Sequence, residues 1–217
     1  MPSRYYDDLN RIVTEAIEQL TVRNTAREQA LAVSREVIRN SANAIRAVHR
    51  GEFEEAQELI EKAGLRLKDT DPMRLENPEI YFAGFLADAR KEFSEANVTL
   101  AVISGSAMPL PQDLGVDPSS YLNGAAEVIG EVRRYILDSL RRDSFDNCQE
   151  LMDVMDEIYS ILLTVDFPEG VTGGLRHSTD QMRGVLERTR GDLTMALRQS
   201  KLELMLAQWE EQRGSGG

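Results

Sequence analysis

The first fifty residues constrain the fold more than any other part of the chain, because no proline or glycine occurs between Ser3 and Arg50. Apolar side chains recur in this stretch at intervals of three and four residues, which places them on one face of an α-helix. These residues are Leu9, Ile12, Val13, Ala16, Ile17, Leu20, Ala30, Leu31, Val33, Val37, Ile38, Ala42, Ile45 and Val48. The pattern predicts one very long helix or two nearly collinear helices, and this length is typical of an arm or a wall rather than of a compact core.

Start and stop signals predict five more helices. Asn77 and Asp117 each precede a proline, which is a common helix start, and Ser144 is a further candidate N-cap. The expected helices cover residues 53–67, 77–103, 117–142, 144–164 and 175–212, with loops at 105–116 and 166–174. No stretch has the alternation of a convincing strand, so the sequence predicts an all-α protein. We expect one helical domain over residues 1–213 and a flexible tail at 214–217.

Charge and cysteine usage limit the class of protein. The formal net charge is -12, which argues against a simple electrostatic nucleic-acid binder without excluding nucleic acid. Only four of the 25 basic residues are lysines, a composition that favours a halophilic source over an ordinary acidic cytosolic protein. The single cysteine, Cys148, cannot form an internal disulfide, and no signal peptide or membrane span is evident. We therefore expect a cytoplasmic protein without a membrane partner.

Two pairs of carboxylates are the strongest candidates for chemistry. Glu92 and Glu95 fall on one face of one expected helix, and Glu127 and Glu131 on one face of the next. The second pair lies in a stretch that is otherwise almost free of charge, where a carboxylate is costly unless something compensates it. A divalent cation such as Mg²⁺ or Mn²⁺ suits an oxygen-rich site of this kind. The alternative is a solvated acidic face, since 37 acidic residues produce such pairs by chance.

The residues around the second pair favour the metal site. Gly124, Glu127, Glu131 and Arg134 share one helical face, and Gly124 and Gly130 are costly inside a helix unless a close approach requires them. The sequence therefore predicts two adjacent antiparallel helices whose acids converge, with room for a substrate beside them. Converging carboxylates repel and raise each other's pKa unless a cation neutralises them.

Hydrolysis of a phosphodiester is the reaction that such a site would support. A carboxylate-bound metal can polarise a phosphoryl oxygen and activate a water molecule. A nearby arginine would stabilise the charge on the phosphate. The candidates for contacting nucleic acid are Arg90, Arg133 and Arg134, each of which can also be read as an ordinary surface residue.

These motifs resemble the translin and translin-associated factor X (TRAX) family. The resemblance to the family's signature helix rests on Tyr121-Leu122-x-Gly124-x-x-Glu127-x-x-Gly130-Glu131-x-x-Arg134, followed by Asp138-Ser139-Leu140 in place of Asn-Ser-Val. In addition, Lys91-Glu92-Phe93-Ser94-Glu95-Ala96 resembles the TRAX run Gln-Glu-Tyr-Val-Glu-Ala. The similarity covers about residues 81–198, and the long helices at both ends also fit.

The resemblance implies a translin-like helical bundle, usually of seven helices, that assembles into a closed homo-oligomer, an octamer. It implies single-stranded RNA or DNA bound inside. For the TRAX branch it also implies a magnesium-dependent endoribonuclease, whose catalytic acids fall on Glu92, Glu95 and Glu127. Glu127 stands where TRAX has Asp, and Glu131 is a fourth possible metal ligand or a residue that supports the ligands.

The chain also departs from translin. The histidine-rich, basic RNA-contact stretch of translin has no counterpart in Arg74-Leu-Glu-Asn-Pro78, and His49 and His177 are expected to be surface or packing residues. Three hypotheses therefore stand: a metal-dependent endoribonuclease closer to TRAX, a non-catalytic RNA- or DNA-binding oligomer like translin, and a structural bundle whose acids face solvent.

Overall fold

The computed structural model describes residues 3–214, and this part of the chain forms ten helices and no strand. The helices are α1 (Tyr6–Arg50), α2 (Phe53–Lys68), α3 (Met73–Glu76), α4 (Pro78–Tyr81), α5 (Gly84–Ser104), α6 (Pro111–Leu114), α7 (Pro118–Leu140), α8 (Cys148–Leu162), α9 (Glu169–Thr172) and α10 (Leu175–Gly214). The all-α prediction is confirmed, and the first helix is one unbroken element of 45 residues. Gly214 belongs to α10, and the rest of the predicted tail, 215–217, lies outside the described residues.

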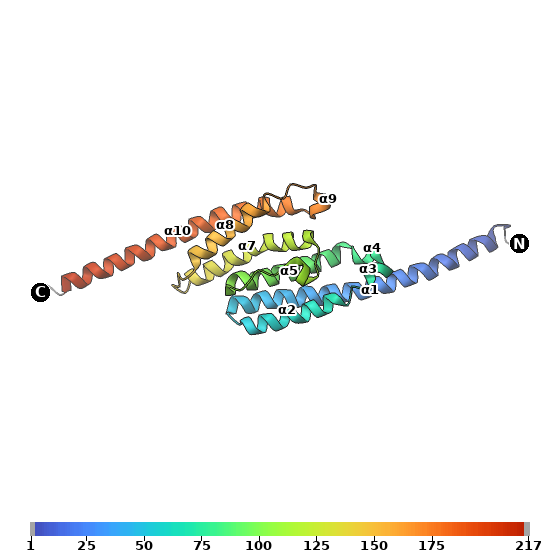
Figure 1. The fold of residues 1–217 in the computed structure, drawn as a ribbon, viewed down its shortest axis with the longest axis horizontal. Coiled ribbons are helices and arrows are strands. Elements are labelled where there is room, and N and C mark those ends of the chain that lie inside the picture. The colour runs from blue at the N-terminus through green and yellow to red at the C-terminus, as the bar shows by residue number, and fades with distance from the viewer. Residues whose placement is uncertain (1–2, 215–217) are drawn as a thin grey trace.

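The long helices lie side by side in a bundle in which α5 and α7 occupy the centre (Figure 1). Contacts between these two helices advance along both in the same direction. Ser120 Oγ donates to the carbonyl oxygen of Ala87, and further along, Glu127 pairs with Lys91. The two helices are therefore parallel, and the antiparallel arrangement expected from the sequence is wrong. The segment between them, residues 105–117, returns along the bundle to the end at which α5 starts, so α7 begins beside the start of α5 (Figure 1).

Two apolar cores flank this central pair. One core lies between α1, α2 and α5 and includes the buried residues Val37, Val48 and Phe93. The other joins α7, α8 and α10 and includes Ile129 and Met155. Because apolar packing covers the outer faces of α5 and α7, the polar face between them is held in a fixed position.

The third expected helix divides into α4 and α5, with Phe82 and Ala83 between them. The break exposes the carbonyl oxygen of Tyr81, which accepts a hydrogen bond of 3.1 Å from Arg90 Nη1. Asn77 does not cap α4 with its side chain as expected, although its backbone carbonyl oxygen accepts from the first turn. A buried arginine from the following helix thus satisfies the end of α4.

Of the other two predicted helix starts, one is confirmed and one is wrong. Asp117 caps α7 by accepting from the backbone N–H of Ser120 at 3.0 Å, as expected. Ser144 does not cap α8, because residues 144 and 145 are irregular, residues 146 and 147 form a turn, and Asn147 stands at the N-cap position with a φ of 60°. Asparagine tolerates this left-handed conformation better than most residues, which explains the later start.

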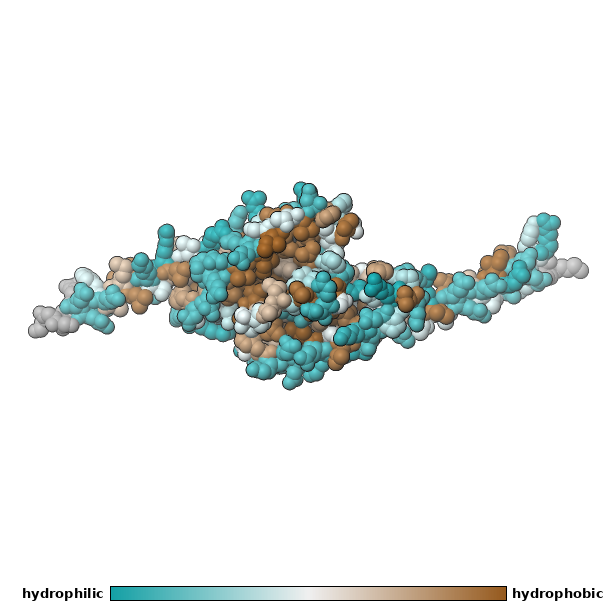
Figure 2. All heavy atoms as spheres, in the orientation of Figure 1, coloured by the Kyte–Doolittle hydropathy of each residue, from teal (hydrophilic) through white to brown (hydrophobic). Residues whose placement is uncertain are grey.

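Two helical arms project from opposite ends of the bundle (Figure 1). Every residue from 3 to 25 on the N-terminal side, and from 201 to 212 in α10, is exposed. Apolar side chains are scattered along both arms in the space-filling view (Figure 2). Within the described residues, none of the helices combines the length and the apolar character needed to cross a bilayer.

Candidate metal centre

A glycine allows α5 and α7 to approach closely. A Cβ atom added at Gly124 would lie 2.6 Å from the carbonyl oxygen of Lys91 and 2.9 Å from the backbone nitrogen of Glu95. These are backbone atoms, which cannot rotate away. The close approach predicted for Gly124 is therefore confirmed, whereas a Cβ at Gly130 would meet nothing within 4 Å.

This approach brings three carboxylates together beside the glycine. Glu92 and Glu95 of α5 and Glu127 of α7 each place a carboxylate oxygen so that all three lie within 4.8 Å of one another. In an octahedral magnesium site with ligands at about 2.1 Å, opposite oxygens are separated by roughly 4.2 Å. Adjacent oxygens in such a site are about 3.0 Å apart, so three oxygens within 4.8 Å of one another are near the range that one ion requires.

Glu95 is the deepest member of this cluster, with 7% of its surface exposed. Burial, followed by the charges of Glu127, Glu92 and Glu131, raises the pKa of the Glu95 carboxyl to about 9. A buried acid with this pKa must hold a proton at neutral pH or gain a cation nearby. The hypothesis that these acids simply face solvent is therefore wrong for Glu95.

The other two acids of the cluster do have a cation beside them, Lys91, which was missed as a site residue in the sequence. Its Nζ lies 2.7 Å from Glu127 Oε1 and 3.4 Å from Glu92 Oε1. Burial by itself lowers the pKa of Lys91, but the hydrogen bond and charge of Glu127, with the charge of Glu92, outweigh it and raise the pKa. The sequence signal was the placement of Lys91 four residues before Glu95, one helical turn away on the same face.

Glu131 lies one turn beyond Glu127 and has partners of its own. Its Oε2 is 2.5 Å from His49 Nε2 and 3.9 Å from a guanidinium nitrogen of Arg134. His49 is buried, and its Nδ1 has no hydrogen-bond partner among the described residues. Glu131 lies outside the three-acid cluster, so its assignment as a metal ligand stays a prediction.

The three candidate arginines occupy different environments. Arg90 is buried, stacks over Tyr81 at 4.1 Å, and lines a cavity of about 350 Å³. Arg133 ties α7 to α10 through hydrogen bonds of 3.0 Å to Thr189 and 2.9 Å to Asp192. Arg134 is exposed beside Glu131 and is the one of the three placed near the carboxylates. Nucleic-acid contact by any of them stays a prediction.

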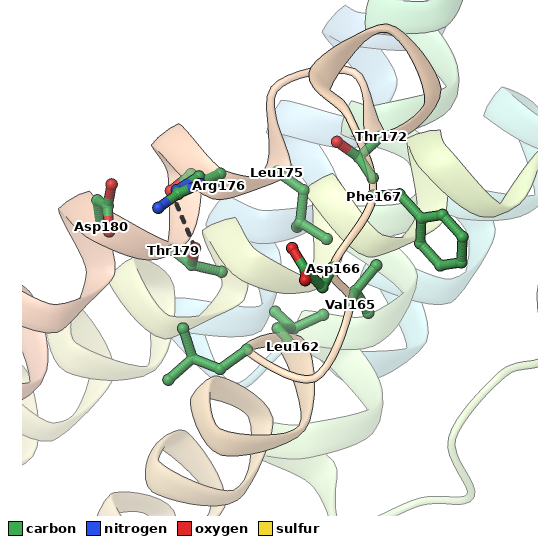
Figure 3. A pocket seen from close by; sticks show the side chains of 10 residues that line it. Leu162, Val165, Asp166, Phe167, Thr172, Leu175, Arg176, Thr179 and Asp180 are labelled. Carbon is green, nitrogen blue, oxygen red and sulfur yellow. Dashed lines mark hydrogen bonds between the residues drawn. The ribbon is translucent and has the colours of Figure 1, made fainter.

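A second cavity of about 350 Å³ lies where the loop after α8 meets the start of α10 (Figure 3). Apolar side chains such as Leu162, Val165 and Leu175 line it together with the polar Asp166 and Arg176. None of the candidate site residues lines this cavity.

The raised pKa of Glu95 predicts how stability depends on pH in metal-free protein. Between its ordinary value of 4.5 and about 9, Glu95 keeps a proton in the folded state that it loses on unfolding. The folded state binds more protons, so the free energy of unfolding falls as pH rises through this window, by at most about 1.4 kcal/mol per pH unit. Glu95→Gln, which cannot ionise, should melt at a higher temperature than wild type at pH 8 to 9 and show a flatter pH profile.

Melting temperatures between pH 5 and pH 9, measured in the presence of a chelator, test this expectation. The exposed Glu150 provides a control, because Glu150→Gln should keep the wild-type profile. An equally steep profile in Glu95→Gln and in wild type would mean that another group controls the dependence.

Comparison with known proteins places this chain in a family. The crystal structure of AfC3PO, from Archaeoglobus, and that of its complex with duplex RNA are 36% and 37% identical to this chain, each with a TM-score of 0.78. The matches cover 85% of this chain and 96% and 95% of those chains. The chain belongs to the translin/TRAX (C3PO) family.

Two more distant similarities concern the fold and the sequence. The apo structure of NeC3PO shares 17% identity with a TM-score of 0.74, covers 90% of this chain and 99% of that chain, and shows the same fold. An uncharacterized protein of Methanocaldococcus jannaschii is 29% identical over 198 residues, which are 90% of this chain and 86% of that protein. No protein-family model matches the chain.

Proposed function

We propose that this translin/TRAX family member is a divalent-metal-dependent endoribonuclease that cleaves phosphodiester bonds of single-stranded RNA. In this proposal Glu92, Glu95 and Glu127 are catalytic residues that hold Mg²⁺ or Mn²⁺, and Glu131 is a fourth candidate ligand. The observation that carries the proposal is the convergence of three carboxylate oxygens within 4.8 Å, one of them on a buried residue.

The chemistry of these side chains fits a hard divalent cation. All three offer oxygen, the element that magnesium and manganese prefer, and all come from helices held by packed cores. Glu92 and Glu127 are about 30% exposed, so a substrate can reach the cluster from that side. A bound ion would polarise the scissile phosphate and activate the attacking water.

The chain's own residues would orient the RNA around this site. The exposed guanidinium of Arg134 lies two turns beyond Glu127 on α7, beside Glu131, and suits a phosphate oxygen. Glu131 is held by His49, so it supports the edge of the site from which Arg134 projects. Arg90 and Arg133 are secondary candidates for nucleic-acid contact, because both already bond to protein groups.

The preference for single-stranded or duplex RNA needs a direct comparison of the two substrates. AfC3PO was crystallised with duplex RNA. Single-stranded RNA is nevertheless our expected substrate, since an exposed phosphodiester in an unpaired strand can adjust more freely to converging side chains. DNA is a possible further ligand, because phosphate contacts alone do not distinguish it from RNA.

Cleavage assays test the proposal directly. Labelled single-stranded RNA, duplex RNA and single-stranded DNA are incubated with the protein in high salt, with chelator, Mg²⁺ or Mn²⁺. We expect metal-dependent cleavage within the single-stranded RNA. If the protein retains RNA without cleaving it in any metal, the catalytic assignment is wrong.

That outcome would support a second candidate, a non-catalytic nucleic-acid-binding oligomer like translin. The position of Lys91 is the observation in its favour. An ammonium group 2.7 Å from Glu127 neutralises part of the cluster without any metal. Binding that is unaffected by chelator would support this candidate.

We also propose that the protein acts as a closed homo-octamer. The N-terminal arm exposes a line of apolar side chains, Tyr6, Leu9, Ile12, Val13, Ile17 and Leu20, each more than half exposed. A helix projecting into water gains little stability without an apolar partner. A second copy of the chain can cover such a stripe, and the C-terminal arm exposes Leu202 and Met205 in the same way.

Replacing apolar residues of the arm should therefore reduce the size of the particle. We expect Ile12→Ser combined with Ile17→Ser to shift the protein to smaller species while the helical content remains, because the arm lies outside both cores. Light scattering coupled to size-exclusion chromatography measures the mass. Glu15→Gln combined with Glu18→Gln is the matched control on the same arm. An unchanged mass in the serine variant would mean that this stripe does not hold the assembly together.

A further inference from the structure

Lys91 occupies an unusual position for a lysine of this chain. The other three lysines, Lys62, Lys68 and Lys201, are exposed, whereas the side chain of Lys91 is 26% exposed. It lies between the two helices that carry the acids and contacts one acid on each, Glu92 on α5 and Glu127 on α7. The ammonium therefore bridges two carboxylates of the cluster.

The type of cation matters here, because most basic residues of the chain are arginines. An ammonium is a compact point charge with three donors, whereas a guanidinium is a planar fork that needs more room. Where α5 and α7 approach so closely that a Cβ at Gly124 would clash, the smaller cation fits between the carboxylates. The ammonium of Lys91 is thus a small cation that the protein itself places between the carboxylates.

Nucleases with two metals place the ions about 3.5–4 Å apart, bridged by shared carboxylates. Nζ of Lys91 lies 2.7 Å from Glu127 Oε1 and 3.4 Å from Glu92 Oε1, so it occupies the side of these two carboxylates that a second ion would have to share. The charges lead to the same conclusion. When a bound ion keeps Glu92, Glu95 and Glu127 all ionised, these acids and the ammonium carry two net negative charges, which a single divalent ion neutralises; Glu131 is left out of this sum because it pairs with His49 and Arg134. A second ion would leave an excess of positive charge and repel Lys91.

We propose that the ammonium of Lys91 takes the place of a second metal ion in the carboxylate cluster. The site would then hold one divalent ion per chain. This inference rests on the proposed metal centre and adds the number of ions to it. Lys91 fills the place that a second ion would take between Glu92 and Glu127. Removing its charge opens that place to a second ion.

Manganese binding tests the inference without relying on activity. Calorimetry with the full-length protein should give one Mn²⁺ per wild-type chain. In Lys91→Met, which keeps the apolar stem and removes the charge, we expect two Mn²⁺ per chain. Two neighbouring ions should also give an exchange-coupled electron paramagnetic resonance spectrum in the variant that is absent from wild type.

Further variants separate the possible outcomes. Lys91→Gln, which keeps a polar group, serves the same purpose if Lys91→Met does not fold, and Lys62→Met is a control lysine on an exposed face. Two ions in wild type, or one ion in both Lys91 variants, would overturn the inference while leaving the metal centre intact. If wild type binds no Mn²⁺ and Glu127→Gln changes nothing, the metal centre itself is wrong.

Discussion

Glu127→Gln is expected to abolish metal-dependent RNA cleavage, with a fall in kcat of at least about 100-fold, since even the loss of a residue that supports a metal ligand costs 10- to 100-fold. The amide keeps the shape of the side chain but removes the charge that would bind the ion. It also deprives Lys91 of its 2.7 Å partner. The experiment measures single-turnover cleavage of labelled RNA in saturating Mg²⁺ and in Mn²⁺.

Two controls make this result specific. The mass of the particle should be unchanged, because Glu127 lies between α5 and α7 rather than on an arm. Glu150→Gln, an exposed acid on α8, should cleave like wild type. Full activity in Glu127→Gln would mean that the assignment of the catalytic acids is wrong.

Gly124→Ala should destabilise the protein by about 3 kcal/mol, near the upper end of what overpacking usually costs. The added Cβ would lie 2.6 Å from the carbonyl oxygen of Lys91, so α7 must move away from α5. That movement also separates Glu127 from Glu92 and Glu95. We therefore expect weaker Mn²⁺ binding in addition to the lower stability, and urea unfolding with calorimetry measures both.

Gly130→Ala is the matched control and should change stability in the opposite direction. A Cβ there meets nothing within 4 Å, and alanine is favoured over glycine inside a helix, so we expect a gain of about 0.5–1 kcal/mol. Similar effects of the two substitutions would show that the close approach at Gly124 does not limit the packing of the helices.

The periodicity of the sequence was sufficient to predict the long helices, because each of them buries one apolar face. It was not sufficient to predict their direction. Whether α7 runs parallel or antiparallel to α5 depends on the path of residues 105–117, and a loop sequence carries no periodic signal. The break after Tyr81 was also missed, because the residue that satisfies it, Arg90, lies nine positions away on the next helix.

The acids of the site were predictable, but their neighbours were not. The helical spacing and Gly124 pointed to Glu92, Glu95 and Glu127, which the structure brings together. His49 lies 82 residues before its partner Glu131, and no local pattern connects two positions so far apart. Lys91 was part of the Lys91–Ala96 run, but the contact of its side chain with Glu127 depends on the parallel packing of α5 and α7.

The parallel arrangement of α5 and α7 has a consequence for folding kinetics. Isolated helices form in microseconds or less from local contacts, whereas the carboxylate cluster needs two segments that are separated by 36 residues along the chain at Lys91 and Glu127. A chain with all its helices formed but α7 not yet docked carries every acid and has no cluster. Formation of the site is therefore a late and cooperative event, which ties any activity of the acids to completion of the tertiary structure.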